Sequence, residues 1–242
     1  MTDFTYPETL PAADLKRLLT ATGYAASTEA TRYYLNGVYL HAHDGTLRAV
    51  ATDGARMSIA DCSAASTGPG ILVPTVAAKR VLALLGRKPA GTVALEYSTC
   101  ATQAAVTYRG ERVVIDLTVY PFPQYQRAIP RDVPHVLKVD AGAFALAVKH
   151  IKPAKKTDPV RLTLSRADGL MLSTPAMSMQ VTGATYAGLN QECGIQWRFL
   201  SDMLAGVAGP ITGAFPSAAK RHSSFWQIAP DVKCVVMPRL LP

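Results

Sequence analysis

The sequence predicts an α+β protein built from two tandem copies of one unit, each with two helices packed on antiparallel sheets. Short runs of β-forming residues are separated by turn dipeptides, which is typical of antiparallel hairpins. Two segments in each half are predicted to be helices. Landmarks of the first half recur in the second at offsets of 120 to 124 residues, for example Asp44-Gly45 and Asp168-Gly169, or Gly86 and Gly206. This recurrence predicts a duplicated β-α-β-β-β-α-β-β-β unit.

The first half opens with a short strand over residues 3–10, followed by a helix. The helix starts at Pro11, a residue that a first helical turn tolerates, and ends at Gly23. Its apolar face is formed by Leu15, Leu18, Leu19 and Thr22.

A hairpin over residues 31–52 comes next, and its turn is predicted at Asp44-Gly45. Its first strand is predicted from the β-formers Tyr33, Leu35, Val38 and Leu40. Asp53-Gly54 then reverses the chain again. The rest of this half is predicted as a strand near residues 56–61, a loop over 63–70, a strand end directly before residue 74, a helix over 74–85 that stops at Gly86, and strands over 92–97, 103–108 and 112–119.

The second half is predicted as a strand over residues 135–139, a helix at about 140–152, a hairpin over 160–174, a strand over 178–186, a helix at about 196–206 and a hairpin over 224–237. One face of its first helix carries Phe144, Ala147, Val148 and Ile151. The proline-rich residues 122–134 are interpreted as an extended linker. The predicted domains are therefore residues 1–121 and 135–242.

Composition narrows the class of protein. No apolar run is long enough for a membrane span, and the first residues lack the pattern of a signal peptide. Cys62, Cys100, Cys193 and Cys234 are widely spaced, which predicts free buried thiols in a cytoplasmic protein. The net charge of +8 favours a polyanionic partner.

Motifs for catalysis or cofactor binding are missing from the sequence. Gly86 and Gly91 have the spacing of a P-loop, but Thr92 stands where that motif requires lysine. His41 and His43 alternate on one strand face and have no third ligand nearby, so a solvated face is favoured over a metal site. We therefore expect a protein that is not an enzyme and uses no cofactor.

Three blocks of sequence resemble one family. RYYLNG (residues 32–37) followed by LRAVATDGAR (47–56) resembles the second domain of the bacterial DNA polymerase III β subunit, the sliding clamp. FPQYQRAIP (122–130) and CVVMPRL (234–240) are similar to that family's next linker and its C-terminal strand and tail. The resemblance covers nearly the whole chain and implies two tandem clamp-type domains, in a short form that lacks the family's usual N-terminal domain.

The resemblance implies a ring of six such domains whose helices face double-stranded DNA without sequence specificity. The charged residues that fall on predicted helices or their ends, where they would line such a channel, are Lys16, Arg17, Lys79, Arg80, Lys149, Lys152 and Arg198. The family's RYYLNG tyrosines lie on a loop near the DNA, which implies DNA contact for Tyr33 and Tyr34, with Arg32 beside them. The alternatives are that the charged residues form ordinary solvated faces and that at least one of the two tyrosines packs in the core.

The resemblance also implies a hydrophobic pocket that binds a short peptide of a DNA polymerase or another partner with a clamp-binding motif. The matching residues are Leu35, Thr52, Gly54, Arg56, Met57, Pro123, Arg127, Ala128, Val235, Met237 and Pro238. Ala55 stands where the family often has histidine, and Leu241 and Pro242 extend past the family's usual end. Alternatively, these residues only seal a junction between domains.

Two functions follow from the resemblance. One is a processivity clamp, in which three copies close a homotrimeric ring around DNA in the cytoplasm. The other is a clamp-derived protein that forms no ring and competes for, or recruits, clamp partners. The family tends to be apolar at both positions of Ile151-Lys152, in its subunit interface, so Lys152 would weaken a ring. A clamp loader is a further candidate partner that the resemblance implies.

Overall fold

The computed structural model describes residues 4–98, 102–117, 121–217, 219 and 221–241. The chain divides into two compact units, Met1–Gln124 and Tyr125–Pro242. Cys100, Pro242 and the end of the strand predicted over residues 112–119 lie outside the described residues.

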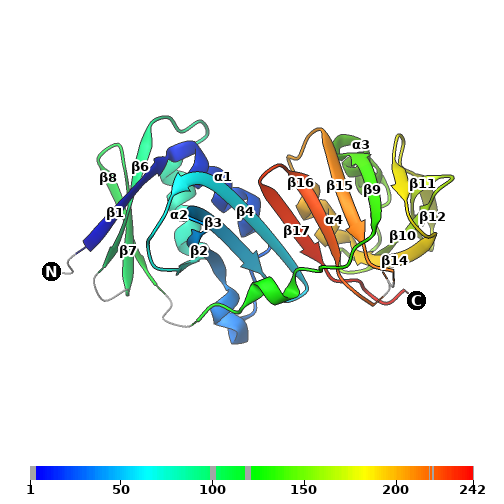
Figure 1. Ribbon diagram of the computed structural model, residues 1–242, viewed down its shortest axis with the longest axis horizontal. Helices are drawn as coiled ribbons and strands as arrows, with labels where there is room; N and C mark the ends of the chain where they lie inside the picture. The colour runs from blue at the N-terminus through cyan, green and yellow to red at the C-terminus, as the bar shows by residue number, and fades with distance from the viewer. Residues whose placement is uncertain (1–3, 99–101, 118–120, 218, 220, 242) are drawn as a thin grey trace. The chain divides into compact units, whose positions relative to one another are not determined.

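The first unit has two antiparallel sheets (Figure 1). One has the strand order β1-β6-β7-β8 and consists of β1 (Phe4–Pro11), β6 (Thr92–Ser98), β7 (Gln103–Tyr108) and β8 (Glu111–Asp116). The other has the order β4-β3-β2-β5 and consists of β2 (Gly37–His43), β3 (Thr46–Thr52), β4 (Arg56–Ala65) and β5 (Ile71–Pro74).

Two helices, α1 (Ala12–Gly23) and α2 (Thr75–Leu85), contact each other and strands of both sheets. The predicted apolar face of α1 is buried, with Leu15, Leu18 and Leu19 at most 2% exposed. Helix α2 stops at Gly86, whose φ of 67° is positive and whose amide donates to the Leu82 carbonyl at 3.1 Å. The predicted helix positions are therefore confirmed to within about one residue.

Two hairpins of this unit have two-residue turns with positive φ at both positions. Asp44 and Gly45 have φ of 49° and 77° between β2 and β3, and Arg109 and Gly110 have 52° and 84° between β7 and β8. Such turns match the right-handed twist of the paired strands. The predicted turn at Asp44-Gly45 is thus confirmed.

The second unit has the same plan. Its first sheet contains the order β9-β15-β16-β17, with β9 (His135–Asp140), β15 (Pro210–Phe215), β16 (Ser224–Ala229) and β17 (Val232–Val236). Its second has the order β12-β11-β10-β14, with β10 (Pro159–Ser165), β11 (Gly169–Thr174), β12 (Met177–Gln180) and β14 (Gln191–Gln196). Helices α3 (Ala141–His150) and α4 (Trp197–Leu204) pack on each other.

The sheet orders confirm the duplication predicted from the sequence. β1-β6-β7-β8 corresponds to β9-β15-β16-β17, and β4-β3-β2-β5 corresponds to β12-β11-β10-β14. The predicted unit has three strands between its two helices, whereas each observed unit has a fourth, β5 or β14, directly before the second helix. The strand end predicted just before the helix at residue 74 is confirmed as β5. The second unit also adds β13 (Thr185–Ala187), which pairs with β9.

The strand predicted over residues 31–36 is wrong. Residues Ala30–Leu35 form the 3-10 segment η1, and β2 begins only at Gly37. Local hydrogen bonds favour the turn: the Arg32 amide donates to the Glu29 carbonyl at 3.0 Å, and the Asn36 side chain donates to the same carbonyl at 3.0 Å. Side-chain bonds of this kind compete with strand pairing and outweigh the β propensity of the two tyrosines.

Several predictions in the second half also need correction. The strand expected over residues 178–186 is two short strands, β12 and β13, because Gly183 has a φ of 73° and the Ala184 amide bonds the Val181 carbonyl. The helix expected over 140–152 ends at His150, and the one expected over 196–206 ends at Leu204. Strands β14 and β15 were not predicted, and β4 extends to Ala65, into the predicted loop.

Candidate functional site

The turn between β3 and β4 is closed by several local hydrogen bonds and carries several predicted pocket residues. The Asp53 Oδ1 atom accepts from the amides of Ala55 at 2.9 Å and Arg56 at 3.0 Å. The Thr52 hydroxyl donates to the Arg56 carbonyl at 2.7 Å and accepts from the Gly54 amide at 3.1 Å. Gly54 has a φ of 89°, which disfavours other residues. Thr52 and Gly54 are therefore held in one backbone conformation.

Arg56 is a structural residue of this turn. It is 6% exposed, and its guanidinium bonds the Asp53 carboxylate at 3.1 Å and the Tyr24 carbonyl at 2.7 Å. It also lies 5.5 Å from the centroid of the Tyr24 ring. The charge of Arg56 is thus used to fasten the turn to the end of α1.

Segment η1 lies against the same turn. Arg32 donates to the Asp53 carbonyl at 2.9 Å and pairs with Glu29 at 3.0 Å. Tyr33 is 45% exposed and meets the half-buried Tyr34 edge to face, with ring centroids 5.7 Å apart. Arg32 and Tyr33 are therefore on the surface next to the turn.

The remaining predicted pocket residues of the first unit differ in exposure. Leu35 and Met57 are each 4% exposed and belong to the core of the unit. Pro123 is exposed. Leu35 and Met57 therefore present little of their side chains to solvent.

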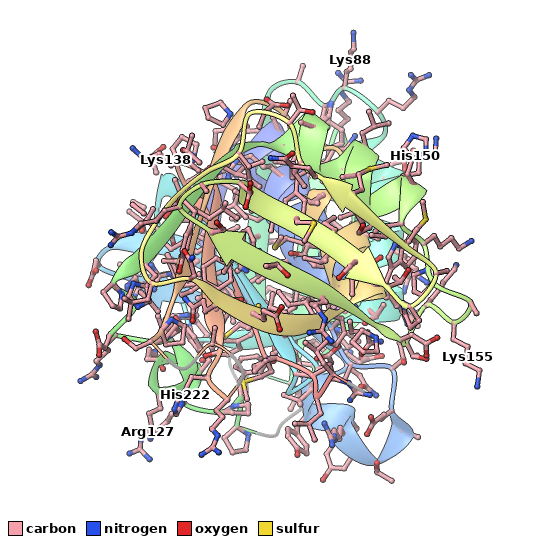
Figure 2. All side chains as sticks on the ribbon, turned by 90° about the vertical axis from the view of Figure 1, so that its right-hand side faces the viewer. Lys88, Arg127, Lys138, His150, Lys155 and His222 are labelled. Atoms are coloured by element: carbon pink, nitrogen blue, oxygen red, sulfur yellow. The ribbon has the colours of Figure 1, made fainter. Side chains whose placement is uncertain are left out.

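In the second unit, the predicted pocket residues lie on η2 (Tyr125–Ala128) and at the end of β17. Arg127 and Ala128 are exposed, and Figure 2 shows Arg127 projecting from the surface. Val235 is 4% exposed, whereas Met237 is 43% exposed. Pro238, half-buried, leads from Met237 into the C-terminal tail.

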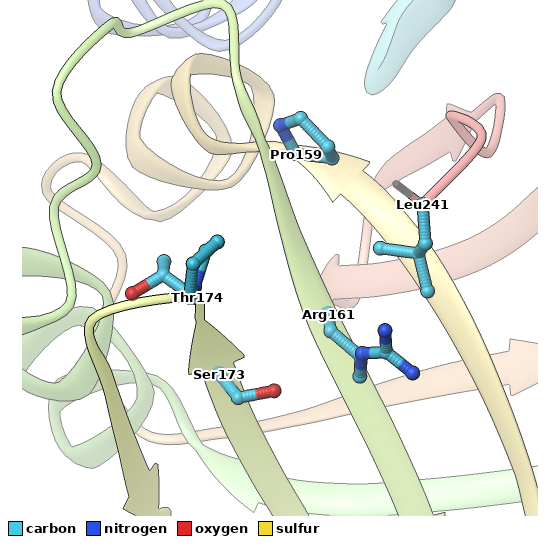
Figure 3. A pocket seen from close by; sticks show the side chains of 6 residues that line it. Pro159, Arg161, Ser173, Thr174 and Leu241 are labelled. Carbon is cyan, nitrogen blue, oxygen red and sulfur yellow. The ribbon is translucent and has the colours of Figure 1, made fainter.

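The tail after Pro238 docks on the outer edge of β14. The Arg239 amide donates to the Gly194 carbonyl at 2.8 Å, and a Cβ atom at Gly194 would lie 2.6 Å from the Arg239 carbonyl oxygen. Leu241 covers Gly194 and lines a hollow of about 150 Å³ with Pro159, Arg161 and Ser173 (Figure 3). This contact was not predictable from the sequence, because Gly194 and Leu241 form no recognisable motif.

The predicted DNA-facing residues of α1 are engaged within the first unit. Lys16 donates to the carbonyls of Gly86 and Arg87, both at 2.6 Å, at the C-terminal end of α2 where the helix dipole favours a cation. Arg17 donates to the Asp61 carbonyl at 2.9 Å and lies 3.6 Å from Asp14. Both side chains remain partly exposed.

Other predicted DNA-facing residues are exposed. Lys79 and Arg80 project from α2, and Lys149 from α3. Lys152 follows α3 and lies 5.9 Å from the centroid of the Trp197 ring. Arg198 is the second residue of α4 and lies 3.4 Å from Asp202.

No metal cluster or membrane helix is found in the described part of the chain. No group of three His, Cys, Asp or Glu side chains gathers there, and no helix there has the length and apolar character to cross a bilayer. The rings of His41 and His43 lie 6.0 Å apart, and burial lowers the pKa of His41. Burial raises the pKa of the free thiol of Cys193 to about 12, so it stays protonated at neutral pH.

Comparison with known proteins agrees with this architecture. Residues 9–118 match the family model of the DNA polymerase III beta subunit, central domain. The chain is 35% identical to the beta sliding clamp of Caulobacter vibrioides, covering 93% of this chain and 63% of that protein. It is 30% identical to that of Pseudomonas aeruginosa, covering 94% and 64%. The chain therefore spans less than two thirds of the length of these relatives.

Solved structures give the same result. A sliding clamp from Bartonella birtlesii, determined with bound griselimycin, superposes with a TM-score of 0.89 at 30% identity, covering 100% of this chain and 68% of that one. The clamp of Caulobacter crescentus gives 0.87 at 29% identity, covering 98% and 66%. The fold is the sliding-clamp fold, with about two clamp domains in this chain, and the family is not enzymatic. Sequence, duplicated topology and these matches together show that the chain belongs to the β sliding clamp family.

Proposed function

We propose that this chain is a DNA sliding clamp that encircles duplex DNA in the cytoplasm and tethers a DNA polymerase through a short peptide. The observation that carries the proposal is the repeated clamp unit, in which each copy pairs two helices with two antiparallel sheets. Exposed Lys79, Arg80 and Lys149 on these helices supply positive charge for DNA phosphates. Such contacts carry no base-sequence preference.

For the peptide, we propose the predicted pocket residues as the binding surface. Their chemistry suits a short ligand with large apolar side chains: a turn at Thr52 and Gly54 that is closed by its own hydrogen bonds, and the adaptable, exposed side chain of Met237. Because few side chains are buried, we expect micromolar affinity, about 7–9 kcal/mol.

We propose a head-to-tail trimer as the assembly, because three copies of this chain supply six clamp units. Light scattering over a concentration series tests it. A mass of three chains, reached as concentration rises, is expected. A mass that stays at one chain throughout would refute the ring.

One observation favours the second candidate, a clamp-derived peptide binder that forms no ring. Ile151 is fully buried in its own unit, and Lys152 is exposed and positively charged. Neither residue offers an apolar surface to a neighbouring copy. Peptide binding by a protein that remains monomeric would support this candidate.

A further inference from the structure

The positive charge of this protein is concentrated in one unit. Residues 125–242 contain 14 Lys and Arg against 7 Asp and Glu, whereas residues 1–124 contain 11 against 10. The second unit therefore carries seven of the eight net positive charges. A charge asymmetry of this size indicates where a polyanion is attracted.

Part of this excess lies in the connection between α3 and β10. Lys152, Lys155 and Lys156 are all exposed there, and we call residues 152–156 the cationic loop. The adjacent Asp158 is the nearest acid in sequence, and its carboxylate accepts the Lys155 amide at 3.2 Å. None of the three lysines forms a salt bridge with any residue that the structure describes. No salt bridge to a described residue therefore neutralises these three lysines.

Trp197, the first residue of α4, bonds the chain on both sides of the cationic loop. The indole Nε1 donates to the Val148 carbonyl of α3 at 2.7 Å, and the Trp197 amide donates to the Asp158 carbonyl at 3.0 Å. The next amide, of Arg198, donates to the Lys156 carbonyl at 3.1 Å. The Lys152 ammonium lies above the indole ring. The backbone is thus ordered before any ligand binds, which lowers the entropy cost of binding.

We propose that the cationic loop, with Arg198 beside it, is the main site at which this protein contacts the phosphates of duplex DNA. This inference takes its ligand from the proposed function. Lysine ammonium groups on flexible stems act as point charges toward phosphate and read no base edges. Lys152 and Arg198 were predicted to face DNA because they lie on helices or at helix ends, whereas Lys155 and Lys156 were missed. The cluster K-x-x-K-K after a helix is the signal that indicates them.

The test uses the full chain and a short linear duplex, which a ring cannot hold topologically. Binding is measured by fluorescence anisotropy over a salt series. The double variant Lys155→Gln/Lys156→Gln should make the slope of log affinity against log salt shallower by about 1.8, at about 0.9 per phosphate contact. Both side chains are exposed, so the fold should be unchanged.

The matched control is Lys88→Gln/Lys138→Gln, which removes the same charge from two other exposed lysines. Within the second unit, Figure 2 shows Lys138 on the side opposite Lys155 and His150. The salt slope of this control variant should stay close to that of the unsubstituted protein. Equal slope changes in both double variants would overturn the proposal, because the effect would then follow net charge and not location.

Light scattering on the same variants tests whether the loop binds a second copy of the chain instead of DNA. A loop variant with altered mass and an unchanged salt slope would mean that the loop binds a second copy, and would also overturn the proposal. Retention on circular DNA is governed by ring closure instead. If the salt slope changes as expected but the protein is not retained on circular DNA, the ring is refuted and the cationic loop still stands as the DNA site.

Discussion

At the scale of single residues, exposure separates the side chains that can meet a peptide from those that hold the fold. Met237 is 43% exposed, whereas Leu35 and Met57 are buried. We predict that Met237→Lys weakens binding of a polymerase-tail peptide at least tenfold, about 1.4 kcal/mol, because a charge would replace an apolar contact. Isothermal titration calorimetry measures the affinity, and circular dichroism checks that the fold persists.

Met177 on β12 offers a matched control, since it is also 43% exposed. Met177→Lys should leave peptide affinity unchanged. Equal losses in both variants, or no loss in Met237→Lys, would contradict the assignment of Met237 to the pocket. A charged residue in place of Leu35 is a poor test. The charge would be buried in the core, and the variant would lose peptide binding by unfolding and not through the site.

At the scale of elements, local chemistry decided which predictions succeeded. The hairpin turn at Asp44-Gly45 and the helix stop at Gly86 both need residues that accept positive φ, and both were predictable from these residue types. Segment η1 was not, because its hydrogen bonds to Glu29 outweigh β propensity. Strand β14 lacks strict alternation, since Cys193, Gly194 and Ile195 are buried in succession. Its pairing with β10 comes from tertiary context.

The edge of β14 gives a prediction at this scale. Leu241 lies over Gly194 next to the Arg239–Gly194 hydrogen bond, whereas its neighbour Leu240 is 91% exposed. Leu241→Ala should release the tail and speed hydrogen exchange of the Arg239 amide roughly fivefold, for a loss of about 1 kcal/mol of local stability. Leu240→Ala is the control and should leave that rate unchanged. Identical exchange in the two variants would show that Leu241 does not anchor the tail.

At the scale of the whole molecule, the duplication was predictable because turns and helix stops recur at a constant offset. The candidate site was not predictable from any pattern. Its residues come from a turn, a linker and a tail that share no periodicity, so only the family resemblance indicated them. Residues outside the family's motifs, such as Lys155 and Gly194, required the structure.

Topology gives the prediction that belongs to the whole molecule. A closed ring leaves circular DNA only by opening, so protein loaded on a nicked circle should survive a high-salt wash that screens phosphate contacts. Cutting the circle should release it, because the ring slides off the ends. Gel filtration of the DNA-bound fraction before and after cutting measures both.

Lys79→Glu/Arg80→Glu should weaken direct binding to DNA without changing peptide affinity, because both residues project from α2. Protein that stays on the DNA after the circle is linearised would contradict encirclement. A strong preference for one base sequence would contradict the phosphate contacts as well, and both results together would favour the peptide binder that forms no ring.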